Sequence, residues 1–154
     1  MSKLDEIGDR VLVVFDGCCG LCNRSVRWFL RRDRGDRLRF VPFESPLVAG
    51  LLARHGISAA EQGLGQRLGA GPSSILVVRD SGGSNEQLVD RSTGVLAMLA
   101  ELPRPWPAVG AALGWIPRPL RDLGYRLIAR WRYRIWGRYE SCPLPTAEER
   151  GRFL

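Results

Sequence analysis

The segment that decides the fold is Val11-Leu12-Val13-Val14-Phe15-Asp16-Gly17-Cys18-Cys19-Gly20-Leu21-Cys22. Its first five residues are all apolar and favour β-structure, which predicts a buried strand in the centre of a sheet. From Cys22 to Arg32 the spacing becomes that of an amphipathic helix, with Val26 and Phe29 on its apolar side. Three of the four cysteines therefore lie where a central strand passes into the first helix.

The spacing of Cys19 and Cys22 is the one that thiol–disulfide exchange needs. Exchange requires a thiolate that attacks and a second thiol that resolves the mixed disulfide. Free N–H groups and the helix dipole at a helix N-terminus lower the pKa of a thiol below its free value of about 8.5. We therefore predict that Cys19 is the attacking thiolate, with a partly exposed sulfur. Cys22, one turn further into the helix, is predicted to be the more buried resolving thiol.

Three other side chains leave more than one interpretation open. Asp16 can cap the helix or bond the loop N–H groups, the structural role we favour, or accept the proton of Cys22 during exchange. Cys18 is expected to be a bystander rather than an auxiliary redox thiol, since adjacent cysteines rarely bond to each other comfortably. Cys142, which precedes Pro143, is expected to be a small buried residue, with a third redox thiol as the alternative.

The rest of the pattern predicts an α/β chain. Further strands are expected at residues 38–43, 74–79 and 87–90. One helix should follow the N-cap Ser45, with Pro46 at its first position, and end before Gly56. Other helices are expected at a capping box formed by Ser58 and Glu61, from the cap Ser92 to about Leu102, at 106–115, at 120–135 and after Thr146 with Glu149.

This order of elements is that of a thioredoxin-like fold. Strand, helix, strand and helix are followed by two strands and a closing helix, a βαβ-ββα core. We expect one domain over residues 1–154, with the core at about 10–102 and a helical, Trp/Arg-rich extension at about 103–154. The sheet should have about four strands, with residues 11–15 central and helices on both faces.

Composition and charge fit a globular chain with a basic C-terminal third. Apolar residues make up 45% of the 154 residues and charged residues 25%, enough for one core and a polar surface. Residues 102–154 hold ten Arg against four acidic residues, which raises affinity for anionic partners. No apolar run reaches the roughly 18 residues of a membrane span, and the first ten residues are polar. We therefore expect a cytoplasmic protein.

The chain resembles the DCC family of thiol–disulfide oxidoreductases. The family's Asp-Gly-x-Cys-x-Leu-Cys-Asn pattern corresponds here to Asp16, Gly17, Cys19, Leu21, Cys22 and Asn23. The similarity continues at residues 31–33, 51–56, 117–122, 132–134 and 142–145. The resemblance implies a thioredoxin-like fold and dithiol–disulfide activity without a cofactor, on protein or small-molecule thiols and disulfides. Enzymes of this fold often have a cis-proline beside the redox pair, and whether Pro72 is that residue stays open.

Two other site types compete with redox exchange. Cys19, Cys22, Cys142 and His55 could bind zinc, but the chain lacks the second Cys-x-x-Cys or His pair that structural zinc sites usually have. We therefore expect no metal. A phosphatase of the haloacid dehalogenase type also begins with a strand that ends in Asp, but it needs a second Asp at the position of Cys18.

A binding module is the third alternative. Aromatic residues are interleaved with Arg in the C-terminal third, at Trp106, Trp115, Trp131, Tyr133, Trp136 and Tyr139. Such a surface can bind anionic lipid headgroups or nucleic acid. We expect instead that the tryptophans pack the tail onto the domain and that no specific nucleic acid is bound. Contact with an anionic membrane surface is expected to be weak at most.

Overall fold

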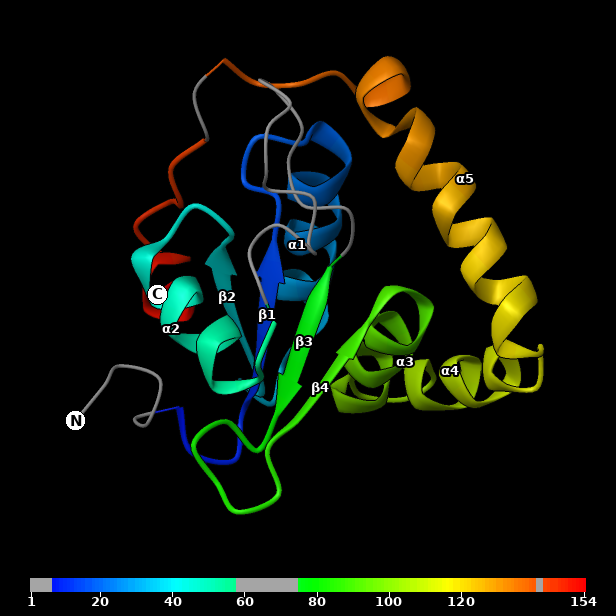
Figure 1. Ribbon diagram of the computed structural model, residues 1–154, viewed down its shortest axis with the longest axis horizontal. Helices are drawn as coiled ribbons and strands as arrows, with labels where there is room; N and C mark the ends of the chain where they lie inside the picture. The colour runs from blue at the N-terminus through cyan, green and yellow to red at the C-terminus, as the bar shows by residue number, and fades with distance from the viewer. Residues whose placement is uncertain (1–6, 58–74, 141–142) are drawn as a thin grey trace.

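A four-stranded mixed sheet forms the centre of the molecule (Figure 1). The computed structural model describes residues 7–57, 75–140 and 143–154. The strands are β1 (Val11–Phe15), β2 (Leu38–Pro42), β3 (Leu76–Arg79) and β4 (Gln87–Asp90), in the spatial order β2-β1-β3-β4. β1 pairs parallel to β2 and antiparallel to β3, and β3 and β4 are antiparallel neighbours. The predicted central position of residues 11–15 is confirmed.

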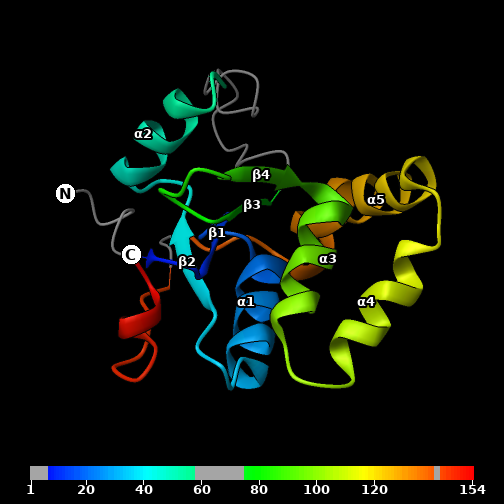
Figure 2. The same ribbon diagram turned by 90° about the horizontal axis from the view of Figure 1, so that it is seen from below.

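Helices cover both faces of this sheet, as expected. They are α1 (Gly20–Arg32), α2 (Pro46–Arg54), α3 (Arg91–Glu101), α4 (Trp106–Gly114), α5 (Arg118–Trp136) and the short 3₁₀ helix η2 (Arg150–Arg152). Figure 2 shows α2 on one side of the sheet and α1 with α3 on the other. The arrangement is a mixed α/β architecture consistent with a thioredoxin-like fold.

The burial of β1 explains its unbroken apolar sequence. Alternate side chains of a strand point to opposite faces of the sheet. Val13 packs with α1 and α3 in one core, whereas Leu12 and Val14 pack with α2 in the other. A strand with cores on both sides has no solvent-facing position, so no polar residue interrupts the run. The buried strand therefore fixes the position of the cysteine segment, which follows directly after β1.

Most boundaries agree with the sequence, with two corrections. Ser45 caps α2 by accepting a hydrogen bond from the Leu47 N–H, and α5 ends at Gly137, whose φ is +74°. α1 begins at Gly20, two residues before the predicted start, because Cys19 itself is the N-cap. Ser92 does not cap α3. Its hydroxyl donates instead to the buried carboxylate of Asp122 in α5, at 2.5 Å.

The C-terminal third folds back along the core. α4 packs on α3, and α5 then returns across α3 to α1 (Figure 1). Trp106 packs on Trp28, with ring centroids 4.6 Å apart, as the packing interpretation predicted. For Trp115 and Trp131 that interpretation is wrong, since both are exposed. After η2, the chain ends beside β2, where the Leu154 N–H donates to the Phe40 carbonyl.

Three expectations fall on residues outside the described ranges: the capping box at Ser58 and Glu61, the peptide bond of Pro72, and the surroundings of Cys142. Among the described residues, no helix has both the length and the apolar character needed to cross a membrane.

The buried carboxylate of Asp33 provides a test of the fold. It accepts hydrogen bonds from the N–H groups of Arg37 and Leu38, both at 3.0 Å, and Arg152 lies 3.3 Å away. Asp33→Ala leaves these buried donors unsatisfied, so we expect a loss of about 2–4 kcal/mol in the free energy of unfolding by urea. Asp9→Ala, at a carboxylate that is 84% exposed, is the control and should leave the midpoint unchanged. Equal midpoints for the two variants would contradict this assignment.

Candidate redox site

The turn between β1 and α1 is held by its own side chains. Cys19 is the N-cap of α1, and its sulfur accepts a hydrogen bond from the Cys22 backbone N–H at 3.3 Å. The Asn23 side-chain amide donates to the carbonyls of Gly17, at 2.6 Å, and of Cys19, at 3.0 Å. A thiol thus occupies the position that Ser or Asp usually takes at a helix start. The sulfur is fixed at the positive end of the α1 dipole and accepts from the Cys22 N–H, so negative charge on it is stabilised.

The two thiols differ in acidity because one donates to the other. The hydrogen bond from the Cys22 thiol, the Cys22 backbone N–H and the Arg132 cation together lower the pKa of Cys19 to about 7, against the opposing effects of burial and Asp16. The same hydrogen bond to Cys19, together with burial and the Cys19 charge, raises the pKa of Cys22. The shared proton therefore stays on Cys22 while Cys19 ionises first. Both cysteines are free thiols.

The exposure predicted for the pair is wrong. Cys19 is 0% exposed, whereas Cys22 is partly exposed. The segment 136–139, which begins at the last residue of α5 and is here called the strap, covers the turn: the Gly20 N–H donates to the Gly137 carbonyl at 3.2 Å, and the Tyr139 N–H donates to the Cys18 carbonyl at 2.8 Å. Cys19 also forms a β-bridge with Arg138. A contact between residues so far apart in the chain leaves no local signal in the sequence.

Asp16 is buried at the end of β1 and is held by α5. One carboxylate oxygen accepts from the Cys18 N–H at 3.0 Å. The other accepts from the Tyr133 hydroxyl and lies 3.4 Å from the Arg132 guanidinium, which also donates to the Tyr133 hydroxyl at 3.1 Å. A buried carboxylate needs such partners to offset its desolvation. These bonds fit the loop-holding role that we favoured for Asp16.

Arg132 is the site residue that sequence reasoning missed. It is buried, and its positive charge helps to lower the pKa of Cys19 and opposes the rise in the pKa of Cys22. Its neighbours on the inner side of α5, Tyr125 and Ala129, precede it by seven and three residues, so a helical spacing connects them. The resemblance did include residues 132–134, which was the available signal. It assigned them no role.

A cavity of about 170 Å³ lies next to Cys22, among α1, α3 and α5. Its walls are mainly apolar, including Phe29 and Met98, while Cys22 and Arg132 supply polar groups. Tyr125 also lines the cavity, and its hydroxyl accepts a hydrogen bond from the Ile75 N–H at 2.9 Å, which ties α5 to the residue before β3. The cavity has room for a small apolar group beside the thiols.

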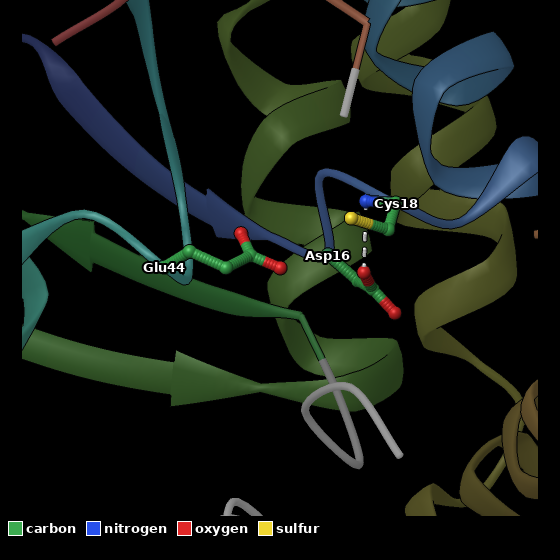
Figure 3. A group of neighbouring side chains, drawn as sticks. All are labelled: Asp16, Cys18 and Glu44. Atoms are coloured by element: carbon green, nitrogen blue, oxygen red, sulfur yellow. Dashed lines mark hydrogen bonds between the residues drawn. The ribbon is translucent and has the colours of Figure 1, made fainter. Parts of the chain in front are cut away.

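Asp16, Cys18 and Glu44 form a second cluster at the turn. Their ligand atoms lie within 4.8 Å of one another, and Figure 3 shows Glu44 extending toward the Asp16–Cys18 turn. Asp16 already accepts the hydrogen bonds described above. Cys18 is disulfide-bonded, which removes the thiolate that a metal would need. The donor set therefore does not fit a metal ion.

The structure separates His55 from the cysteines with which it was weighed as a zinc ligand. His55 ends α2, on the face of the sheet opposite α1. Its Nε2 atom lies 2.8 Å from Glu86 Oε1. The fourth residue of that set, Cys142, lies outside the described ranges.

Comparisons with known proteins identify the family. The profile of the DCC1-like thiol-disulfide oxidoreductase family matches residues 13–138. The "Uncharacterized protein YuxK" of Bacillus subtilis (strain 168) is 29% identical over 150 residues, which is 97% of each chain. The "DCC family protein At1g52590, chloroplastic" of Arabidopsis thaliana is 30% identical over 143 residues, 93% of this chain and 74% of the relative. No solved structure matches significantly. The chain therefore belongs to the DCC1-like thiol-disulfide oxidoreductase family.

Proposed function

We propose that the chain catalyses thiol–disulfide exchange through Cys19 and Cys22. One observation carries the proposal: the Cys19 thiol, whose pKa is lowered to about 7, caps a helix and accepts a hydrogen bond from the backbone N–H of Cys22, which is itself a free thiol. A pKa near the ambient pH is the optimum for an attacking thiol, because a large thiolate fraction is combined with good nucleophilicity. The substrates would be thiols and disulfides of proteins or small molecules.

In the reducing direction the Cys19 thiolate attacks one sulfur of a substrate disulfide. A Cys19–substrate S–S bond forms as the substrate S–S bond breaks, and the departing thiolate takes up a proton. Cys22 then loses its proton and attacks the Cys19 sulfur, which forms the Cys19–Cys22 disulfide and releases the second substrate thiol. Two electrons pass from the pair to the substrate. The reverse sequence oxidises a substrate dithiol, and the reduction potential of the pair decides the direction.

Arg132 and Asp16 support this chemistry from behind the pair. Arg132 is a positioning residue: its cation favours the Cys19 thiolate and is held in place by Asp16. Asp16 lines the same cavity as Cys22. Its role as the acceptor of the Cys22 proton stays a prediction, as does the cytoplasmic location expected from the sequence.

The strap has to move during the reaction. Because Cys19 is fully buried beneath residues 136–139, a substrate sulfur can approach it only when the hydrogen bonds from Gly20 and Tyr139 open. The cavity beside Cys22 can receive an apolar group that neighbours the substrate sulfur. We therefore propose that a substrate disulfide with an apolar flank reacts faster than glutathione disulfide, which is highly charged.

The direct test is turnover of glutathione disulfide followed by mass mapping of the trapped species. Cys19→Ser should abolish turnover, since the nucleophile is lost. Cys22→Ser should accumulate a mixed disulfide on Cys19, because the resolving thiol is lost. Turnover that survives Cys19→Ser, or an adduct on another cysteine in Cys22→Ser, would refute the assignment.

The acidity of Cys19 should depend on the donor at position 22. Alkylation of Cys19 at graded pH should have its midpoint at about 7 in the wild type. Cys22→Ala removes the thiol donor and should raise the midpoint, whereas Cys22→Ser keeps a hydroxyl donor and should raise it less. At a pH below the midpoint, each unit by which the pKa of Cys19 rises lowers the rate of alkylation about tenfold. A Cys22→Ala midpoint equal to that of the wild type would mean that the thiol–thiol hydrogen bond is unimportant.

Arg132 should act on the same midpoint through its charge. Arg132→Leu removes the cation and should shift alkylation of Cys19 to higher pH, whereas Arg132→Lys keeps a positive charge and should shift it less. Arg130→Leu, at an exposed arginine of the same helix, is the matched control. Arg132→Leu also leaves Asp16 without its cation, so the thermal transition of each variant is measured first. Coinciding pH profiles for the Leu and Lys variants would contradict a charge effect.

Displacement of the strap should be visible in the limiting alkylation rate. A Cβ atom at Gly20 would lie 2.3 Å from the Trp136 carbonyl oxygen, so Gly20→Ala must push the strap away. We expect Cys19 to react severalfold faster at high pH and the thermal transition to fall. Gly50→Ala, where the new Cβ meets nothing within 4 Å, is the control. An unchanged limiting rate in Gly20→Ala would show that the strap does not restrict access.

A further inference from the structure

An ordinary surface helix turns its apolar side to the core, whereas α5 turns its apolar side to solvent. Its inner side carries the polar contacts of Asp122, Tyr125 and Arg132 with the rest of the chain. Its outer side is an apolar stripe whose residues are 45–63% exposed: Leu120, Leu123, Leu127, Trp131 and Ile135. Their spacing of three and four residues places them along one line of the helix. Surface helices normally bury this stripe against a core.

The stripe continues around the corner between α4 and α5. Leu113 and Ile116 are 41% and 42% exposed, and Trp115 between them is 91% exposed. This corner stands at the end of the molecule away from α2 and β2 (Figures 1 and 2). We call residues 113, 115, 116, 120, 123, 127, 131 and 135 the apolar ridge. A group of exposed apolar side chains of this kind indicates an interaction site.

Arginines follow one flank of the ridge. Arg126, Arg130 and Arg134 are four residues apart, so they lie in one row, and all three are exposed. None of them takes part in a salt bridge among the described residues. The acidic residue of α5, Asp122, is buried on the inner side. The outer surface of the helix therefore combines apolar side chains with uncompensated positive charge.

These features favour a lipid surface over the other occupants. A second copy of the chain, docked through the same face, would offer the arginine rows no opposite charge, because Asp122 of α5 is buried on the inner side. Single-stranded nucleic acid stacks its bases on aromatic rings, whereas most of the ridge is aliphatic. A bilayer that contains anionic lipids satisfies both features, since aliphatic and Trp side chains enter the boundary with the acyl chains while Arg meets the phosphates.

We propose that the apolar ridge and the row Arg126, Arg130 and Arg134 dock the protein on an anionic membrane surface. This inference concerns a surface separate from the Cys19–Cys22 pair, so it stands or falls independently of the proposed redox function. The helix would lie parallel to the bilayer surface, with its outer side toward the acyl chains. Its inner side would keep its contacts with Asp16 and the strap.

Vesicle cosedimentation of the full chain tests the proposal. We expect binding to phosphatidylcholine vesicles that contain 30% phosphatidylserine, no binding to pure phosphatidylcholine, and weaker binding at higher salt. Arg126→Gln, Arg130→Gln and Arg134→Gln together should weaken binding on the order of a hundredfold, since each Arg near the surface contributes about fivefold. The charge-matched control replaces the exposed Arg24, Arg27 and Arg31 of α1 and should have a much smaller effect.

The apolar contribution is tested with single substitutions. Leu127→Glu and Trp115→Ser should each weaken vesicle binding at least tenfold, while glutathione disulfide turnover stays at the wild-type level. Leu144→Glu, at a leucine that is 85% exposed outside the ridge, is the control. Ridge variants that bind like the wild type would overturn the proposal. So would a dimer, seen by sedimentation, that Leu127→Glu dissociates, or binding to single-stranded DNA that matches binding to vesicles.

Discussion

The carboxylate of Asp16 lies out of water at the end of β1, with the guanidinium of Arg132 3.4 Å away. Two charges in a protein interior are costly to desolvate, and the cost is offset only when geometry and hydrogen bonds are good. Here the Cys18 N–H and the Tyr133 hydroxyl complete the set. This contact joins the first strand to the last long helix. The position of α5, and with it the chain that follows, depends on this link.

Several features of the molecule follow from that link. Because Arg132 faces inward, the polar side of α5 faces the core, and its leucines are left in solvent. Because α5 ends near the turn, its next residues pair with Cys18 and Gly20 and cover Cys19. The same guanidinium favours the Cys19 thiolate. One buried ion pair thus connects the acidity of the nucleophile, its shielding and the exposure of the apolar ridge.

The parts that could be predicted from the sequence are those set by local chemistry. The apolar run of β1, the cap at Ser45 and the position of Cys19 at a helix start each depend on neighbouring residues. The exposure of Cys19 could not be read in this way, because residues 136–139 determine it from the far end of the chain. The sequence pattern also did not predict which side of α5 faces the core. A helical pattern shows that two sides differ, but an apolar stripe need not face the core when the core offers a buried carboxylate.

The strap also has a consequence for biosynthesis. A chain emerges from the ribosome N-terminus first, and Cys19 and Cys22 precede Arg132 and Gly137 by more than a hundred residues. During that interval the two thiols have neither the cation nor the cover that the finished molecule gives them. A nascent chain therefore lacks the contribution of Arg132 to the acidity of Cys19 and leaves that thiol open to any oxidant, and the shielding of Cys19 is established only when residues 132–139 have been added. Truncated translation products would carry unprotected cysteines in place of a functioning site.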